Sequence, residues 1–219
     1  MKKYLNIADG GNIEIGTIFC IGKNYAAHAA EMNSVVPTDP IIFIKPANAY
    51  IPDGGEICIP DISKSVHYET ELVVVIGKDW DGEDDSNPID CVEGYAIGID
   101  LTLRDIQQKA KDKGHPWAVA KGFKTSAPIS TVVPKSKIEN GVKFFDLSLE
   151  INGETRQAGN TGAMERDVQT LIKYIAKVFG LNRGDLIFTG TPEGVGEIHS
   201  GDKLHAELKG YVSLDVKVK

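Results

Sequence analysis

Short runs of β-branched and apolar residues, each bounded by Gly, Pro, Asp or Asn, are the feature that most constrains this chain. Runs of roughly four to eight such residues between turn-forming residues are typical of β-strands. The expected strands are 17–21, 41–44, 71–76, 95–100, 147–152, 186–189 and 212–218. The last of them alternates apolar and polar residues, which predicts a half-buried strand. Asn152-Gly153 predicts a hairpin turn.

Helical patterns are fewer and cover residues 24–31, 103–113 and 167–179, with Gly180 placed as a C-terminal cap. Since strands outnumber helices and do not alternate strictly with them, a Rossmann or TIM arrangement is disfavoured. We expect a mostly-β fold with peripheral helices (α+β), shaped as a roll or distorted barrel. Residues 1–15 are expected to form a small N-terminal hairpin, and residues 16–219 the main domain.

Charge and apolar patterning argue against several classes of partner. The chain carries 24 Lys plus Arg against 31 Asp plus Glu, a net charge of −7, and no basic run exceeds two residues. A nucleic-acid partner is therefore not expected. No signal-peptide apolar stretch follows Met1, and the longest apolar run, 72–76, is far shorter than the ~20 residues of a membrane span. We expect no membrane partner and a cytoplasmic location.

Cysteine spacing favours no disulfide framework. Cys20, Cys58 and Cys91 are widely separated and never form a Cys-x-x-Cys motif. This pattern predicts buried, reduced thiols rather than disulfides or a zinc site.

Glu69 and Glu71 lead directly into the apolar run 71–76. Residues two apart on a strand point to the same face, so the two carboxylates should project together. Neighbouring carboxylates raise each other's pKa unless a cation lies between them, and hard divalent cations bind carboxylate oxygens. The alternative is a pair of solvated acids at an exposed strand start.

Asp100 ends the expected strand 95–100, just before the helix 103–113. A charge at the tip of a buried strand is unfavourable unless it is paired or ligates a metal. Asp is also a preferred N-cap residue of helices. The residues alone leave both interpretations open.

His28 and Glu31 are three residues apart in an Ala-rich helical segment. At that spacing they share a helix face, so the carboxylate can orient the imidazole and increase its basicity, as in a general base. The alternative is a surface ion pair. A segment this short and Ala-rich would also suit a mobile lid.

The glycine-rich segment 190–196 follows the expected strand 186–189 and is not a P-loop. Its backbone N–H groups could approach a substrate carboxylate, although a tight structural turn is the simpler interpretation. Lys121 lies beside apolar neighbours in 120–123, where an ordinary surface amine is the alternative.

Six ordered motifs together resemble one family. They are Gly-x-Asn-Tyr-x-x-His-x-x-Glu (22–31), Lys-Pro (45–46), His-x-Glu-x-Glu-Leu (67–72), Gly-Tyr-x-x-x-x-Asp-x-x-x-Arg-Asp (94–105), Ala-Lys-x-Phe (120–123) and Gly-Asp-x-Ile-x-Thr-Gly-Thr-Pro-x-Gly-Val-Gly (184–196). In this order, from Ile18 nearly to the end, the chain resembles the fumarylacetoacetate hydrolase family. It is most similar to the branch of acylpyruvate hydrolases and oxaloacetate-processing enzymes.

The resemblance implies a β-roll, a homodimer and a bound Mg²⁺ or Mn²⁺, with 16–219 as the catalytic domain. It also implies roles for named residues. These are metal ligation by Glu69, Glu71 and Asp100, catalysis by His28, Glu31, Gln107 and Lys121, and substrate binding by Lys23, Tyr25, Arg104, Gly190 and Thr191.

The activity expected from this resemblance is metal-dependent hydrolysis of a C–C bond in an acylpyruvate-type 2-oxo acid, through a metal-bound enolate. His28, oriented by Glu31, would activate the attacking water. Oxaloacetate decarboxylation or tautomerisation, and isomerisation of 2-hydroxyhepta-2,4-diene-1,7-dioate, would use the same site without that water. A non-catalytic binding module on the same fold is a further alternative, against which the pair His28 and Glu31 argues. In every enzymatic case the partner is a small anionic 2-oxo acid.

The chain departs from the family pattern at three places. Glu165-Arg166 stands where apolar residues are usual, Asn48 where Ser or Thr is common, and Lys23 where Arg is common. Lys is a point charge whereas Arg is a bidentate fork, so Lys23 would hold a carboxylate differently.

Overall fold

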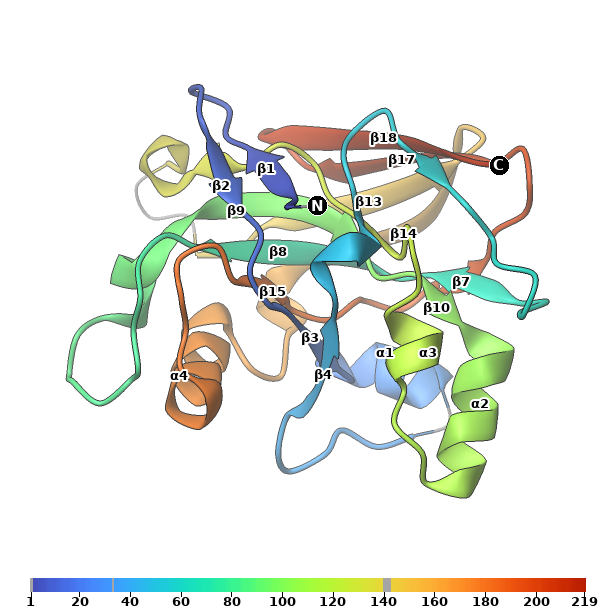
Figure 1. Ribbon diagram of the computed structural model, residues 1–219, viewed down its shortest axis with the longest axis horizontal. Helices are drawn as coiled ribbons and strands as arrows, with labels where there is room; N and C mark the ends of the chain where they lie inside the picture. Colours follow the sequence, from blue (N-terminus) through green and yellow to red (C-terminus); the bar gives the residue numbers. More distant parts are fainter. Residues whose placement is uncertain (1, 33, 140–142) are drawn as a thin grey trace.

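A six-stranded sheet passes through the middle of the molecule (Figure 1). The computed structural model describes residues 2–32, 34–139 and 143–219. In spatial order the strands of this sheet are β12 (Val133–Pro134), β9 (Val92–Ile99), β8 (Thr70–Ile76), β15 (Leu186–Phe188), β3 (Ile18–Gly22) and β4 (Ile41–Lys45). All neighbours are antiparallel except β15 and β3, which are parallel.

A five-stranded sheet packs against one face of this central sheet. Its spatial order is β14 (Glu154–Asn160), β13 (Asp146–Ile151), β17 (Lys203–Leu208), β18 (Val212–Val218) and β6 (Glu56–Ile57). The alternation in β18 buries Leu214, Val216 and Val218, as predicted, and leaves the intervening side chains outside. The expected hairpin at Asn152-Gly153 joins β13 to β14.

Shorter elements surround these sheets. The small sheets are β1 (Tyr4–Asn6) with β2 (Asn12–Glu14), β5 (Tyr50–Ile51) with β11 (Ala127–Pro128), and β7 (Val66–Tyr68) between β10 (Thr102–Leu103) and β16 (Gly196–Glu197). The helices are α1 (Ala26–Glu31), α2 (Arg104–Lys113), α3 (Ala118–Lys121) and α4 (Val168–Phe179), with short 3-10 turns η1 (Ala47–Ala49), η2 (Pro88–Cys91), η3 (Lys135–Lys137) and η4 (Thr161–Ala163).

Strand β8 shows why the central sheet requires cover on both faces. Leu72, Val74 and Ile76 pack into the larger core with the five-stranded sheet and α4, whereas Val73 and Val75 pack into a second core with the N-terminal hairpin. A strand buried on both faces needs a continuous apolar run rather than an alternating one. The sheet is therefore a rigid platform, and polar residues at its strand ends have fixed positions.

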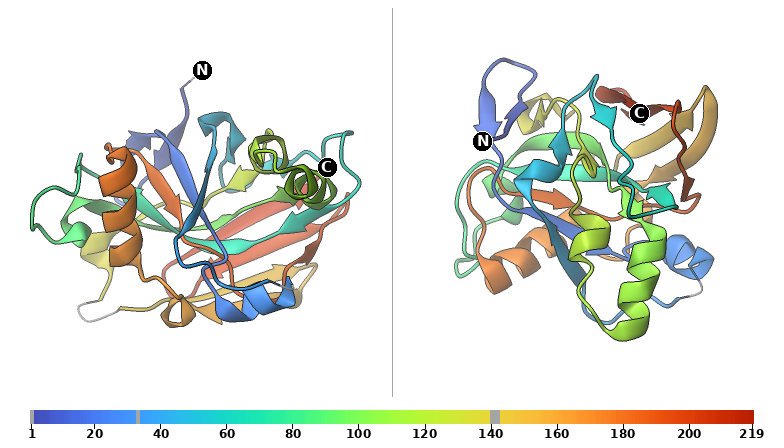
Figure 2. Two further views of the ribbon diagram at one scale, coloured as in Figure 1. Left: turned by 90° about the horizontal axis from the view of Figure 1, so that it is seen from below. Right: turned by 45° about the vertical axis from the view of Figure 1, so that its right-hand side comes forward.

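The predicted fold class is confirmed: the structure is mostly β, with helices at the periphery (Figure 2). Among the described residues the two large sheets end at free edges, so they form a roll and not the closed barrel that "distorted barrel" would suggest. The expected helices are also present. Gly180, with φ of 69°, ends α4 as predicted. Strand β14 was missed because its sequence is almost entirely polar, and β17 was missed although Leu204, Ala206 and Leu208 alternate with polar residues and are buried.

The N-terminal hairpin is present in the described part of 1–15, which excludes Met1. Its Leu5 and Ile13 are buried in the second core together with Phe188 of β15. The division into a hairpin and a domain of 16–219 remains a prediction.

The cysteine prediction was right for two residues and wrong for the third. All three thiols are free, and Cys20 and Cys91 are buried, but Cys58 is exposed. Cys58 lies just after β6, which is an edge strand of the five-stranded sheet, and no neighbouring strand among the described residues covers its side chain. Within the described ranges, no helix has both the length and the apolar composition to cross a bilayer.

Candidate metal centre and active site

Three carboxylates meet where β8 and β9 run side by side. Glu69 precedes β8, Glu71 belongs to it, and Asp100 follows β9. The antiparallel register pairs Glu71 with Gly98, and the Asp100 N–H donates to the Glu69 carbonyl at 2.7 Å. One oxygen from each carboxylate lies within 4.8 Å of the others, and all three residues are buried.

The alternatives for these acids are therefore wrong. Glu69 and Glu71 are not solvated, since their exposed fractions are 6% and 1%. Asp100 does not cap α2, because the N-cap position is Leu103 and the side-chain bond in the first turn comes from Asp105, which accepts from the Ile106 N–H at 2.9 Å.

Cations already neutralise two of the three carboxylates. Lys121 Nζ donates to Glu69 Oε2 at 2.8 Å and to Asp100 Oδ2 at 2.7 Å. Arg104 Nη2 donates to Glu69 Oε1 at 2.6 Å. Burial alone would raise the pKa of Glu69, but Lys121 and Arg104 outweigh it and hold that pKa below its usual range. Lys121 is itself buried, so its interpretation as an ordinary surface amine is wrong.

Lys45 is the third cation of this charge network and has no exposed surface. Its ammonium lies 2.8 Å from Asp100 Oδ1 and donates to the Leu101 carbonyl at 3.2 Å and to Ser126 Oγ at 3.1 Å. Sequence reasoning noted the Lys45-Pro46 motif but gave the lysine no role. A charged residue directly after the apolar run 41–44 was the signal that could have identified it.

Glu71 is the carboxylate left without a cation. Among the described residues no ion pair reaches it, and its one hydrogen bond is from the Gly190 N–H at 2.6 Å. Burial, followed by the charges of Asp100 and Glu69, raises the pKa of Glu71 well above its usual value. Three converging carboxylates, one of them unpaired, fit a hard divalent cation.

His28 and Glu31 lie on α1, as expected, and His28 is buried, so the pair does not lie wholly on the surface. His28 Nδ1 is 3.4 Å from Glu31 Oε2. The Gly194 N–H donates to both oxygens of Glu31, at 3.1 and 3.3 Å. The glycine-rich segment thus fixes the carboxylate that orients the imidazole.

Most of the predicted site residues surround one cavity of about 40 Å³. Its lining includes Lys23, His28, Glu69, Glu71, Arg104, Gln107, Lys121 and Thr191. The predicted residues Tyr25, Glu31, Asp100 and Gly190 do not line it. The lining also includes Phe43, Lys111 and Trp117, which sequence reasoning missed.

The predicted substrate contact Thr191 and the predicted catalytic residue Gln107 have geometries that limit what they can do. The Thr191 hydroxyl donates to the Thr70 carbonyl at 2.9 Å and accepts from Gln157 at 2.9 Å, so its proton is already used. Gln107 Oε1 accepts from Arg104 Nη1 at 2.9 Å, which turns the amide oxygen away and leaves the NH₂ group as a donor.

The structure shows what surrounds two of the departures from the family pattern, Glu165-Arg166 and Asn48. The backbone N–H groups of Glu165 and Arg166 donate to Asn24, and the Arg166 guanidinium donates to the carbonyls of Pro37 and Thr38. The pair therefore secures the segments on both sides of α1. Asn48 is exposed within η1.

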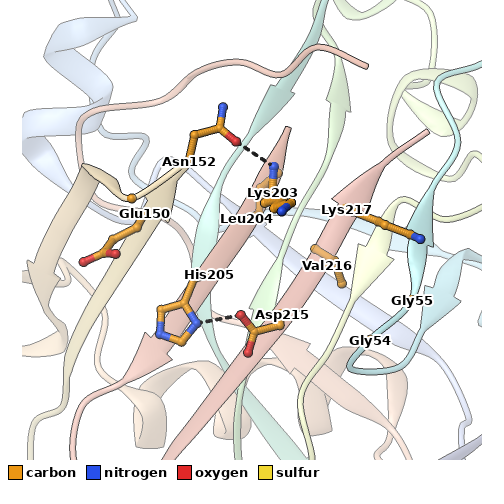
Figure 3. A pocket seen from close by; sticks show the side chains of 11 residues that line it. Gly54, Gly55, Glu150, Asn152, Lys203, Leu204, His205, Asp215, Val216 and Lys217 are labelled. Atoms are coloured by element: carbon orange, nitrogen blue, oxygen red, sulfur yellow. Dashed lines mark hydrogen bonds and ion pairs between the residues drawn. The ribbon is translucent and has the colours of Figure 1, made fainter. Parts of the chain in front are cut away.

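A wider hollow of about 690 Å³ lies elsewhere, on the outer face of the five-stranded sheet (Figure 3). Figure 3 shows the His205–Asp215 pair there, joined at 2.8 Å between Nδ1 and Oδ1. Both side chains are exposed, and none of the predicted site residues lines this hollow. The chemistry is therefore concentrated at the smaller cavity.

Comparison with known proteins identifies the class to which this fold and site belong. Residues 17–219 match the family described as "Fumarylacetoacetate (FAA) hydrolase C-terminal". The chain belongs to the fumarylacetoacetate hydrolase family, as the ordered motifs indicated.

Individual proteins of this family are similar to the chain over nearly its whole length. The chain is 43% identical over 202 residues to the mitochondrial oxaloacetate tautomerase FAHD1 of Homo sapiens, covering 92% of this chain and 91% of that one. It is 41% identical over 204 residues to the oxaloacetate tautomerase YcgM of Escherichia coli, covering 93% of each. A crystal structure of fumarylpyruvate hydrolase from Pseudomonas aeruginosa, in complex with Mn²⁺ and pyruvate, is similar with a TM-score of 0.94 and 35% identity, covering 99% of this chain and 95% of that one.

Proposed function

We propose that this chain is a divalent-metal-dependent enzyme that interconverts the keto and enol forms of oxaloacetate. The observation that carries the proposal is the buried triad of Glu69, Glu71 and Asp100, with Glu71 unpaired, beside the buried His28. The relatives named above as oxaloacetate tautomerases favour this activity over C–C hydrolysis, which the motifs had placed first. Tautomerisation needs a proton transfer but no attacking water.

Glu69, Glu71 and Asp100 would hold the metal, Mg²⁺ or Mn²⁺. When bound, it would act as a Lewis acid toward the carboxylate and carbonyl oxygens of a 2-oxo acid. The Mn²⁺ in the structure of the Pseudomonas aeruginosa hydrolase supports a divalent ion of this kind.

The residues of the chain itself would move and place the proton. With Nδ1 turned toward Glu31, His28 has Nε2 left for the cavity that it lines. There it can take a proton from C3 of the keto form while the C2 carbonyl oxygen gains a proton, and both transfers run in reverse from the enol form. The Gln107 NH₂ group and the Lys121 ammonium line the same cavity and are donors for the oxygen on which enol character develops.

C–C hydrolysis of an acylpyruvate is the second candidate. It is supported by the fumarylpyruvate hydrolase, which is 35% identical over nearly the whole chain, and by the base His28, which could equally activate water. We infer the same metal and residues for it, and a cytoplasmic homodimer remains the expectation for either activity.

The decisive experiment follows the enol absorbance of oxaloacetate with and without Mg²⁺, in parallel with cleavage of acetylpyruvate and fumarylpyruvate. We expect metal-dependent tautomerisation with a higher kcat/KM than either cleavage. His28→Ala should reduce the tautomerisation rate by roughly 10²- to 10⁴-fold, the usual contribution of general acid–base catalysis. A higher kcat/KM for C–C cleavage would overturn the proposal in favour of the second candidate.

A further inference from the structure

Helix α2 directs three polar side chains at the cavity from one of its faces. Arg104, Gln107 and Lys111 are spaced three and four residues apart, so they follow one another along that face, and all three line the cavity. Arg104 and Gln107 bond to each other, and Arg104 also bonds to Glu69. Lys111 has no such engagement, although the same helix face brings it to the same cavity.

Lys111 lies at the outer end of the site. The residue is exposed, whereas Glu71 at the inner end is only 1% exposed. Its Nζ lies 5.4 Å from the ring centroid of Trp117, another cavity residue, and a cation–π contact of this kind holds the ammonium against the cavity wall. The charge is therefore fixed at the rim of the cavity rather than extended into solvent.

Lys23 brings a second uncompensated charge to the same cavity. It follows β3 with a φ of 59°, a left-handed conformation that is uncommon for a residue with a side chain, and its Nζ donates to Ser34 Oγ at 2.5 Å. Within the described ranges, neither Lys23 nor Lys111 forms an ion pair. Partial burial of the ammonium, followed by the charges of Arg104 and Lys23, lowers the pKa of Lys111.

The site thus has two ends at which a carboxylate of a substrate could bind, which we call the inner and the outer pole. At the inner pole the carboxylate triad would hold the metal that receives the 2-oxo acid end of a substrate. At the outer pole, two lysines repel each other unless an anion lies between them. A substrate with a second carboxylate would satisfy both poles, whereas a monocarboxylic acylpyruvate would leave the lysines unpaired.

We propose that Lys111, together with Lys23, binds the distal carboxylate of a dicarboxylic 2-oxo acid and so determines the preference for doubly charged substrates. This inference rests on the proposed function, because it assigns the outer end of the same site. Lys111 acts here as a specificity residue. Proton transfer stays with His28.

The test measures equilibrium binding of oxaloacetate and of its 4-ethyl ester by calorimetry in the presence of Mg²⁺. The ester has the same carbon skeleton without the distal charge. Wild type should prefer oxaloacetate, and Lys111→Met should reduce that preference by roughly 5- to 30-fold, in keeping with loss of a partly exposed charged hydrogen bond. Lys111→Arg should keep most of the preference, and Lys23→Met should reduce it.

Lys113→Met is the matched control. Lys113 shares the last turn of α2, where any cation favours the helix C-terminus, but it does not line the cavity. Its substitution should leave the preference unchanged. Oxalate, which has no distal group, should bind Lys111→Met as tightly as wild type, which also verifies that the variant is folded.

Binding and turnover separate the two proposals. If Lys111→Met retains the wild-type preference for oxaloacetate over the ester, the assignment of Lys111 is wrong, whatever the enzyme does to oxaloacetate. If wild type shows the preference and loses it in Lys111→Met, but does not accelerate tautomerisation, the proposed function fails and the assignment of Lys111 stands. In an active enzyme the effect should lie mainly in KM for oxaloacetate, with kcat changed less.

Discussion

Substituting Lys45 by Met tests whether the buried charge network is a structural requirement of this fold. Methionine has a similar length and is apolar, so Lys45→Met removes the ammonium with little change in volume. Lys45 has no exposed surface, and its ammonium serves Asp100, the Leu101 carbonyl and Ser126. The substitution leaves these groups without that partner in a site that water does not reach.

The expected loss follows from this burial. Removing one partner of a buried ion pair destabilises a protein by about 3–5 kcal/mol, because an uncompensated charge remains. For a chain of this size that corresponds to a fall in Tm of roughly 6–20 °C. The Asp100 carboxylate retains Lys121 at 2.7 Å, so the variant should still fold at low temperature.

The assay is urea unfolding followed by intrinsic fluorescence, with wild type and Lys2→Met alongside. Lys2 forms an ion pair with Glu14 at the same N···O distance, 2.8 Å, but both side chains are exposed. Exposed pairs contribute little, so the midpoint for Lys2→Met should stay close to that of wild type. A free energy of unfolding for Lys45→Met within about 1 kcal/mol of wild type would refute the reasoning, because it would mean that the network does not compensate buried charge.

Three further predictions concern the metal centre and α1. Glu71→Gln should greatly weaken Mg²⁺ or Mn²⁺ binding in calorimetry, and unchanged affinity would exclude Glu71 as a ligand. Because the pKa of Glu71 is raised in the folded protein, its contribution to stability is present below its ordinary pKa and is lost as pH rises through the raised value. Chelator-treated wild type should therefore lose stability over that rise while Glu71→Gln does not, as urea unfolding at several pH values would show. The amides of Ala26–Glu31 should gain hydrogen-exchange protection with Mg²⁺ and oxalate if α1 closes over the site, and equal protection with and without oxalate would argue against a lid.

Local spacing allowed two of the three carboxylates of the metal centre to be predicted. Glu69 and Glu71 are two residues apart at the start of an apolar run, and the period of a strand alone places them on one side. The same local rule identified His28 and Glu31 on one helix face. Because interactions of this kind depend on a few consecutive residues, they can be predicted directly from the spacing of residues in the sequence.

Asp100 shows where local rules become ambiguous. Its position at the end of a strand and before a helix is equally suited to ligation and to capping. The choice depends on the register of β8 against β9, which places the Asp100 N–H on the Glu69 carbonyl. A register between strands is a property of the whole sheet, and a single sequence does not encode it in any short segment.

Phe43, Trp117 and Lys111 could not be predicted for a related reason. Phe43 and Lys45 reach the site because β4 pairs with β3 and α3 packs beside it, and Trp117 and Lys111 because α3 packs beside α2. In sequence they resemble ordinary residues of a strand, a loop and a helix surface. Only the packing of these elements around the strand ends gives Phe43, Trp117 and Lys111 a common cavity and places Lys45 beside Asp100.

The distribution of cations explains how this fold can bury three carboxylates and still offer one of them to a metal. Lys45, Lys121 and Arg104 compensate Glu69 and Asp100, so burying these two does not depend on an added ion. Glu71 receives one backbone N–H instead, and its carboxylate is the one that burial and its neighbours push toward the neutral form. A divalent cation would reverse that tendency by lowering the pKa of Glu71, and binding should therefore release a proton at any pH at which the metal-free Glu71 is still protonated. The charge network thus makes the folded site ready for a metal while confining the dependence on that metal to a single side chain.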